Sequence, residues 1–416
     1  MNANLIWRSV FACAGLLGPS GAWAAQGLTG DWNGKRTAWR DGGTVVDMGY
    51  TVEAARNTSG GDRRASAHAG QLSAAAQLDL QQLWDWKDTR AEVALSLRDG
   101  DEVSRRAGLG TLIQVQEIHG RGHILRLSRL WLEKRMADGR LAVKAGRMGV
   151  GEDFDMLECS ALNLALCGGQ VAVFGGDYWF NGPVSQWGAV LTLRSGRTYL
   201  RSGAYQVNPR YAATSGGGLR IAPSGTVGTL TPVELGWEPA PGGLPGKYVV
   251  GGWYSSAPRA DARTLPAPGV APVPRARSGT YGGWAVAQQQ LTRGRHAAAQ
   301  SGLRAQLGYA QGDPRTGYID QMLSLQLAYT GLAVQRADDT LGLGVASTRV
   351  NPRAALMQRG ADGGTPRREH VAELFYGWKP IPSLYLQPSV QYIRHPGGLS
   401  ARRDATVVGL KADVRF

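Results

Sequence analysis

Apolar and polar residues alternate along most of the chain. In the closing segment "VVGLKADVRF", Val408, Leu410, Ala412 and Val414 fall on one side of an extended chain, together with the last residue, Phe416, while the residues between them are glycine or charged. The same period of two recurs in "VVDMGYTVEA", "AEVALSLRD", "QMLSLQLAY" and "LYLQPSVQY". This pattern predicts strands that have one apolar face and one wet face.

The alternation divides into sixteen predicted strands. Long polar connections follow the odd-numbered strands, whereas tight turns such as "MADG", "SGR" and "KPIPS" follow many of the even-numbered ones. An even strand number with short turns at one end only is typical of bacterial outer-membrane barrels. The expected fold class is therefore all-β, a transmembrane antiparallel β-barrel of 16 strands around a water-filled lumen. The predicted strands span residues 44–56, 71–82, 90–98, 123–134, 140–149, 187–195, 198–207, 229–237, 246–255, 280–290, 302–311, 320–330, 340–349, 370–379, 383–394 and 404–416.

The N-terminus differs from the rest of the chain. It has Arg8, a short apolar run and a small-residue "AWA" site, which together predict a signal peptide over residues 1–24. A lipoprotein signal is the alternative, but the residues around Cys13 fit a lipid-attachment box poorly. Export implies an oxidising compartment, in which Cys159 and Cys167 are expected to form a disulfide.

A short periplasmic segment is expected before the barrel. Residues 25–43 contain "DWNGKRTAWRDGG", in which Asp31 is placed as the N-cap of a short helix that ends at Gly42 and Gly43. This helix would plug or brace the periplasmic mouth. Residues 44–416 are then expected to form the barrel.

Composition and charge narrow the class further. The chain has 59 Gly, 13 Trp and 14 Tyr but only 6 Phe, which suits a large sheet with many turns and amphipathic aromatic residues. The mature chain has no apolar stretch of about 18 residues, so no membrane-spanning helix is expected. The formal net charge of +14 indicates an anionic neighbour, such as lipopolysaccharide or an anionic solute. Nucleic acid is not expected as a partner, because no binding module is present and export conflicts with it.

Catalytic and metal-binding patterns are missing from the sequence. The six His residues, at positions 68, 119, 123, 296, 370 and 395, have no metal-ligand spacing, and neither G-x-S-x-G nor H-E-x-x-H occurs. No enzyme activity, metal or cofactor is therefore expected. An outer-membrane lipase or protease barrel is the alternative, and hydrolysis of phospholipid or peptide would support it.

Eight segments carry a resemblance to a known family. "LTGDWNGKRTAW", "ARNTSGG", "QVQEIHG", "GRMGVGEDF", "CSALNLALCGG", "GAYQVNPR", "DTLGLGVAS" and "LQPSVQYIRHPGG" occur in this order. They resemble the carbohydrate-selective porin family, often called OprB. The resemblance implies a sixteen-stranded channel in the outer membrane of a Gram-negative bacterium, through which glucose and related sugars diffuse passively into the periplasm. It also implies that the C-terminal Phe416 is a signal to the barrel-assembly machinery.

Charged and aromatic residues of inward parity are the candidate lining of the pore. A sugar needs fixed donors, fixed acceptors and an aromatic plane, which Arg, carboxylates and Trp supply. In "ILRLSRLWLEKRM" the alternation changes parity near Ser128, which predicts a β-bulge that re-aims the strand. The candidate sugar-contacting residues are Glu53, Arg98, Arg126, Arg129, Trp131, Glu133, Arg147, Glu152, Asp153 and Trp179.

The long connection at residues 150–186 resembles the third outer loop of sixteen-stranded porins, which folds inward and narrows the pore. A disulfide between Cys159 and Cys167 would cross-link a short part of it, a constraint worth about 2 to 3 kcal/mol. Opposed Arg and acidic residues also line porins without sugar specificity. The alternative function is therefore a general or anion-preferring porin, and the sequence leaves a monomer or a homotrimer open.

Overall fold

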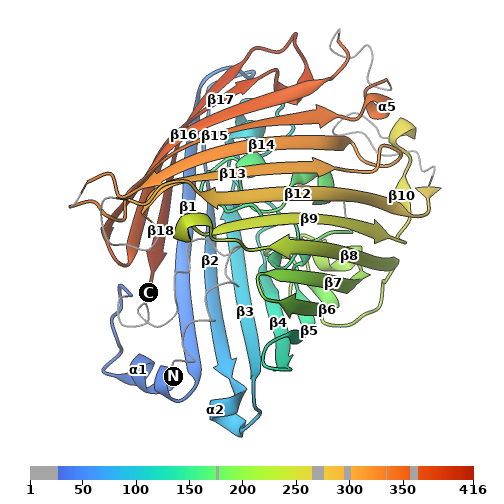
Figure 1. Ribbon diagram of the computed structural model, residues 1–416. Coiled ribbons are helices and arrows are strands. Elements are labelled where there is room, and N and C mark those ends of the chain that lie inside the picture. The colour runs from blue at the N-terminus through green and yellow to red at the C-terminus, as the bar shows by residue number, and fades with distance from the viewer. Residues whose placement is uncertain (1–26, 175–177, 265–275, 295–300, 334, 357–363) are drawn as a thin grey trace.

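The computed structural model describes residues 27–174, 178–264, 276–294, 301–333, 335–356 and 364–416. The predicted signal peptide lies outside these residues. Sixteen strands close into one antiparallel barrel, and β10 and β11 form a separate two-stranded sheet (Figure 1). The barrel strands are β1 (Thr44–Ser59), β2 (Ser66–Asp79), β3 (Thr89–Gly100), β4 (Leu125–Met136), β5 (Leu141–Met148), β6 (Gln186–Ser195), β7 (Thr198–Val207), β8 (Gly228–Trp237), β9 (Gly246–Ser255), β12 (Thr280–Gln290), β13 (Gly302–Gln311), β14 (Ile319–Thr330), β15 (Thr340–Val350), β16 (Arg368–Ile381), β17 (Leu384–Arg394) and β18 (Ala405–Arg415).

The remaining elements lie in the connections. β10 (Arg259–Ala260) and β11 (Ala276–Arg277) are two residues each and belong to the connection between β9 and β12. No helix in the described part of the chain is long and apolar enough to cross a membrane. The helices are α1 (Lys35–Asp41), α2 (Leu80–Trp84), α3 (Val103–Ala107), α4 (Val171–Phe174) and α5 (Pro352–Ala355).

Antiparallel pairing follows chain order around the barrel, and β18 closes it against β1, with Glu53 opposite Lys411. The predicted fold class is thus confirmed, and each predicted strand overlaps a barrel strand. β2 is the most displaced: it begins at Ser66, before the predicted start at residue 71, and ends at Asp79. The chain turns into α2 there because the Asp79 carboxylate caps the helix, accepting hydrogen bonds from the backbone N–H groups of Gln81 and Gln82 at 3.0 and 3.3 Å.

The bulge predicted in β4 is present. Arg129 pairs with Ala94 and Leu127 pairs with Leu95, so Ser128 is the extra residue between two successive pairs. Leu130 and Leu132 after the bulge are exposed on the outer face. The bulge therefore turns Arg129 and Trp131 to the lumen face of the wall.

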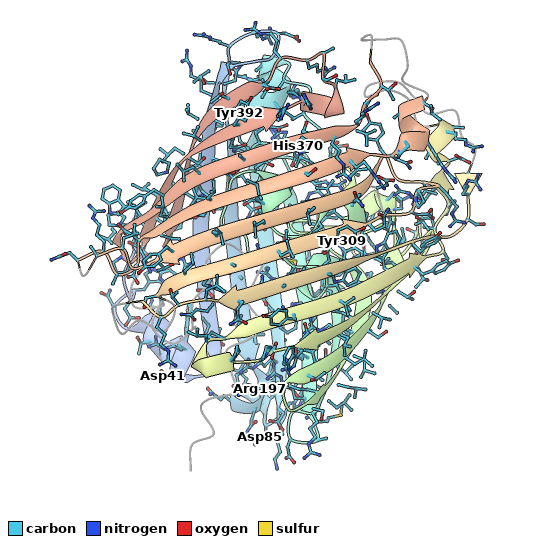
Figure 2. All side chains as sticks on the ribbon, turned by 45° about the horizontal axis from the view of Figure 1, so that its top comes forward. Asp41, Asp85, Arg197, Tyr309, His370 and Tyr392 are labelled. Atoms are coloured by element: carbon cyan, nitrogen blue, oxygen red, sulfur yellow. A yellow bond between two sulfur atoms is a disulfide. The ribbon has the colours of Figure 1, made fainter. Side chains whose placement is uncertain are left out.

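The outer face of the barrel has the pattern expected for contact with lipid. Exposed Leu and Val residues occupy its middle, and exposed aromatic residues lie toward both ends. Figure 2 shows Tyr392 and His370 toward one end of the molecule and Asp41, Asp85 and Arg197 toward the other. The first end carries the long connections and exposes Tyr254, Tyr281, Tyr309 and Tyr392; the second carries the tight turns and exposes Trp84, Trp86, Trp237 and Trp378. Two such aromatic belts mark the two membrane interfaces.

The N-terminal segment before β1 packs against the C-terminus of the chain. Helix α1 begins after Gly34, and Asp31 does not cap it directly but accepts hydrogen bonds from the backbone N–H and the hydroxyl of Thr37 at 2.9 and 3.0 Å. The buried Arg36 donates from Nη1 to the C-terminal oxygen of Phe416 at 2.7 Å. The helix therefore braces the closing strand at the tight-turn end of the barrel.

Candidate functional site: the constriction of the lumen

Two long connections fold into the barrel. Loop 2 (residues 101–124) joins β3 to β4, and loop 3 (residues 149–185) joins β5 to β6. The described part of loop 3 crosses to the opposite wall, where the backbone N–H of Glu158 donates to Gln306 of β13 at 2.6 Å and the Asn163 side chain donates to Gln391 of β17 at 2.9 Å. This path narrows the lumen.

Aromatic packing fixes the start and the end of loop 3. Trp179 is fully buried, and its ring packs edge-to-face on Trp253 of β9 and Trp284 of β12, at centroid distances of 6.5 and 5.6 Å. Phe154 packs on the same Trp284 at 6.5 Å. The predicted stacking platform Trp179 therefore offers no open face, because its ring is used to dock the loop.

Glycines in the wall receive the leucines of loop 3. A Cβ at Gly308 would lie 2.7 Å from Leu157, and a Cβ at Gly344 would lie 2.7 Å from Leu166. A Cβ at Gly409 would likewise lie 2.8 Å from a methyl group of Leu162. These contacts are closer than a side chain tolerates, so the three glycines allow the loop to approach the wall.

Buried carboxylates of the wall tether the backbone of both loops. Glu373 of β16 accepts from the N–H groups of Leu162 and Asn163, both at 2.9 Å. Glu369, on the same strand, accepts from the N–H of Leu112 in loop 2 at 2.7 Å. An ionised acceptor makes these bonds stronger than neutral ones. Glu53, one of the predicted pore residues, acts in the same way, because it is fully buried and accepts from the N–H of Ile118 at 3.3 Å.

Acidic groups within the loops are also shielded from water. Glu102 accepts a hydrogen bond from the N–H of Val115 at 3.1 Å, and burial raises the pKa of its carboxyl to about 7. Burial also raises the pKa of Asp155 well above its usual range, although the carboxylate is held by the side chain and the N–H of Gln170 at 2.7 and 2.8 Å. The loops are thus packed as ordered parts of the interior.

The predicted disulfide between Cys159 and Cys167 is present. It closes a segment with a sequence separation of 8, within loop 3 and around Leu162 and Asn163. The sulfur of Cys159 lies 3.9 Å from a carboxylate oxygen of Glu117 in loop 2. The bridge therefore stands where the two inward loops meet.

Two of the predicted arginines are occupied by protein groups. The guanidinium of Arg126, which is 2 % exposed, donates to the carbonyls of Tyr211 and Ala213, both at 2.8 Å. That of Arg147, which is 1 % exposed, donates to the carbonyl of Ser185 at 2.7 Å and lies 3.9 Å from the centre of the Tyr211 ring. Arg126 connects the wall to loop 4 (residues 208–227), and Arg147 connects it to loop 4 and to the end of loop 3, so neither is open to a solute.

The other predicted residues lie on the lumen side at different heights. Arg129 donates to Glu92 at 2.6 Å, and Arg135 donates to Glu133 at 2.8 Å. Arg98 is partly buried and donates to the side chain of Gln71 at 2.6 Å. These contacts place the charged ladder of β3 and β4 along the wall.

The remaining members of the predicted set gather at the start of loop 3. Lys144 of β5 forms a salt bridge with Asp153, and its Nζ lies 5.4 Å from the centre of the partly buried Trp131 ring. The Glu152 carboxylate accepts a hydrogen bond from the N–H of Gly149 at 3.0 Å, so it supports the first turn of the loop.

Several residues of the constriction were not predicted. Glu158 of loop 3 and Arg304 of β13 form an ion pair at 2.9 Å, with side chains 47 % and 34 % exposed. Lys411 of β18 lies 3.0 Å from Glu117 and 3.4 Å from Glu53. The inward parity of Arg304 and Lys411 was visible in the alternation of their strands, but nothing in the sequence indicates which strands face the two loops.

Many of the inward-facing cations in the described part of the lumen are paired with acidic groups. Seven of them lie within 4 Å of a carboxylate, so donors and acceptors stand side by side, whereas Arg98, Arg126 and Arg147 donate to amide or carbonyl oxygens. The pairs are Arg129–Glu92, Arg135–Glu133, Lys144–Asp153, Arg194–Glu238, Arg201–Glu234, Arg304–Glu158 and Lys411–Glu117.

A closed sixteen-stranded barrel with aromatic belts and an inward third loop defines a porin. The family model of the carbohydrate-selective porins, OprB family, matches residues 63–416, and the chain belongs to this family. It is a family of outer-membrane channels of Gram-negative bacteria that pass sugars.

Curated relatives and a solved structure agree with this assignment. The chain is 35 % identical to Porin B of Pseudomonas aeruginosa, over 96 % of this chain and 92 % of that protein. It is 33 % identical to the Putative porin QuiX of Acinetobacter baylyi, over 94 % and 93 % of the two chains. The high pH structure of Pseudomonas putida OprB has a TM-score of 0.88 and 33 % identity, covering 95 % of this chain and 99 % of that one.

Proposed function

We propose that the chain passes neutral monosaccharides by passive diffusion through the space that loop 3 leaves open. The observation that carries the proposal is the pairing of charges along the lumen. A paired cation and carboxylate give a sugar hydroxyl both a donor and an acceptor, while the pair as a whole attracts an ion only weakly. Glucose would exchange its water for such pairs one after another, and no step requires energy input.

Glu158 and Arg304 are the residues proposed to contact sugar most directly. Their side chains are the most exposed of the paired set that involves an inward loop. Arg98, Arg129 and Glu133 are proposed as further contacts along the wall. Trp131 is the proposed aromatic surface, because its ring is only partly buried.

Replacing Arg304 by glutamine tests the assignment. The substitution removes the charge at the pair but keeps an amide donor, so glucose should block the channel roughly two- to tenfold more weakly, the value of about one net hydrogen bond. The matched comparison is Arg194→Gln, which removes the same charge from a pair near the tight-turn end that involves no residue of an inward loop, so it should weaken glucose block less than Arg304→Gln does. Equal glucose block in Arg304→Gln and the parent channel would exclude Arg304 as a sugar contact.

A general or anion-preferring porin is the alternative. It is distinguished by the reversal potential in a salt gradient, measured with glucose block on the same channels. A strong anion preference without block by glucose would favour the alternative over a sugar-selective channel.

The route to the membrane is also part of the proposal. The mature chain is proposed to begin after residue 24, to be assembled through recognition of Phe416, and to contact lipopolysaccharide with its outer loops, as a monomer or a homotrimer. N-terminal sequencing of protein from the outer-membrane fraction tests the cleavage site. Deletion of Phe416 should lower the amount of folded protein in that fraction, and an unchanged amount would contradict the assembly role.

A further inference from the structure

An open apolar groove lies on the lipid-facing side of the barrel, at the tight-turn end. Its volume is about 400 Å³. Its floor is a row of leucines from four neighbouring strands that face one another in register: Leu141, Leu193, Leu200 and Leu235. The last three are exposed, so membrane lipid must cover them.

The groove lies beside β5, the shortest strand of the barrel wall. β5 has 8 residues and β6 to β8 have 10 each, against 16 in β1, and Figure 1 shows β5, β6 and β7 as short strands beside the long β1, β2 and β3. At ~3.3 Å per residue and a tilt of ~40°, the 8 residues of β5 rise only about 20 Å, less than the ~25 Å apolar band of such barrels, whereas the 10 residues of β6 to β8 rise about 25 Å and match it. Only β5, at one end of the leucine row, falls short of the apolar band, so lipid headgroups come close to Leu141 there.

A polar rim stands above the leucine floor. Arg140, Ser195 and Thr198 come from the two tight turns that line the groove. The guanidinium of Arg140 has no hydrogen bond or ion pair within the described residues, whereas Arg194 beside it is bound to Glu238 at 2.6 Å. Asp138, at the tip of the same turn, makes no ion pair with Arg140 in the described structure.

An aromatic residue marks the depth of this rim in the membrane. Thr198 pairs in register with Trp237, which is 52 % exposed on the outer face. Exposed Trp residues lie at the level of the lipid headgroups. The free guanidinium and the two hydroxyls thus stand at headgroup depth, directly above an acyl-sized apolar groove.

We propose that this groove binds an anionic glycerophospholipid of the periplasmic leaflet, with its phosphate on Arg140, Ser195 and Thr198 and one acyl chain along the leucine row. The site is separate from the lumen. It would anchor the barrel in the membrane beside β5, where the wall is shortest.

Native mass spectrometry of the full mature protein, released from detergent micelles, measures the binding. The probe is phosphatidylglycerol, compared with phosphatidylcholine of the same acyl chains. Arg140→Gln should retain about tenfold less phosphatidylglycerol, because it loses one charge-assisted contact to the phosphate, and Arg140→Lys should restore part of the retention. Lys35→Gln is the matched control, since it removes one exposed cation at the same end of the barrel, from α1.

Folding of each variant is checked by heat-modifiable migration in gels and by unchanged single-channel conductance. Equal phosphatidylglycerol retention by Arg140→Gln and Lys35→Gln would overturn the proposal. Equal retention of phosphatidylcholine and phosphatidylglycerol by the parent protein would also overturn it, since the groove would then hold lipid by its apolar floor alone.

Discussion

Replacing Glu373 with glutamine is expected to loosen loop 3 while the barrel stays closed. The Glu373 carboxylate is fully buried and accepts two hydrogen bonds, from the N–H groups of Leu162 and Asn163, both at 2.9 Å. Glutamine has one acceptor oxygen, so one of the two N–H groups would face an amide NH₂ and lose its partner. The loss of one hydrogen bond to a charged group costs about 1.5 to 3 kcal/mol.

This cost falls on the docking of the loop and not on strand pairing. A difference of 1.5 to 3 kcal/mol shifts the equilibrium between a docked and an undocked loop by roughly ten- to hundredfold. Other contacts of the loop remain, including the hydrogen bond from Asn163 to Gln391 at 2.9 Å. We therefore expect a channel that opens its constriction intermittently.

Single-channel recording in planar bilayers tests this expectation. Glu373→Gln should show more open-channel noise, excursions to higher conductance and weaker block by glucose. Glu238→Gln is the matched control, because Glu238 lies near a tight turn and pairs with Arg194 of the wall at 2.6 Å. Noise and glucose block equal to those of the parent channel in Glu373→Gln would refute the tether.

Three further substitutions test other contacts. Replacing both Cys159 and Cys167 with serine should raise open-channel noise, because the free energy that holds loop 3 in its folded conformation falls by about 2 to 3 kcal/mol. The strand content measured by circular dichroism should not change. Recordings equal to those of the parent channel would show that the bridge has no role in the constriction. Gly344→Val should displace Leu166, because even a Cβ would lie 2.7 Å from its methyl group, and should raise the conductance; a conductance equal to that of the parent would show that the wall can adjust. Arg36→Ala should lower the unfolding temperature by removing the 2.7 Å hydrogen bond to the C-terminus, and an unchanged temperature would show that the clamp is dispensable.

The strands were predictable because each one faces lipid on one side and water or protein on the other, so its apolar and polar residues must alternate. That requirement acts on neighbouring residues, so the period of two is visible in the local sequence. The bulge at Ser128 was predicted for the same reason, because a change of parity is a local signal. The shift of β2 was missed because "SAHAG" has little apolar contrast and because the cap at Asp79 ends the strand earlier than the pattern suggests.

The constriction was less predictable because its contacts join distant parts of the chain. Glu373 and Leu162 are 211 residues apart, and neither residue carries a local sign of the other. Arg147 and Trp179 have the chemistry of a sugar site, but both side chains are buried and their contacts dock the long loops against the wall. The small residues at wall positions such as Gly409 were the available signal, since a glycine of inward parity marks a place where something approaches the wall.

The passage of glucose through a constriction lined by charge pairs is tested most directly by conductance of the purified mature protein in a planar bilayer, with glucose added stepwise, beside glucose uptake into liposomes. The account predicts ion channels that glucose blocks in a concentration-dependent way, with weak ion selectivity and faster uptake of glucose than of a charged solute of similar size. Channels that conduct without any glucose block would contradict it.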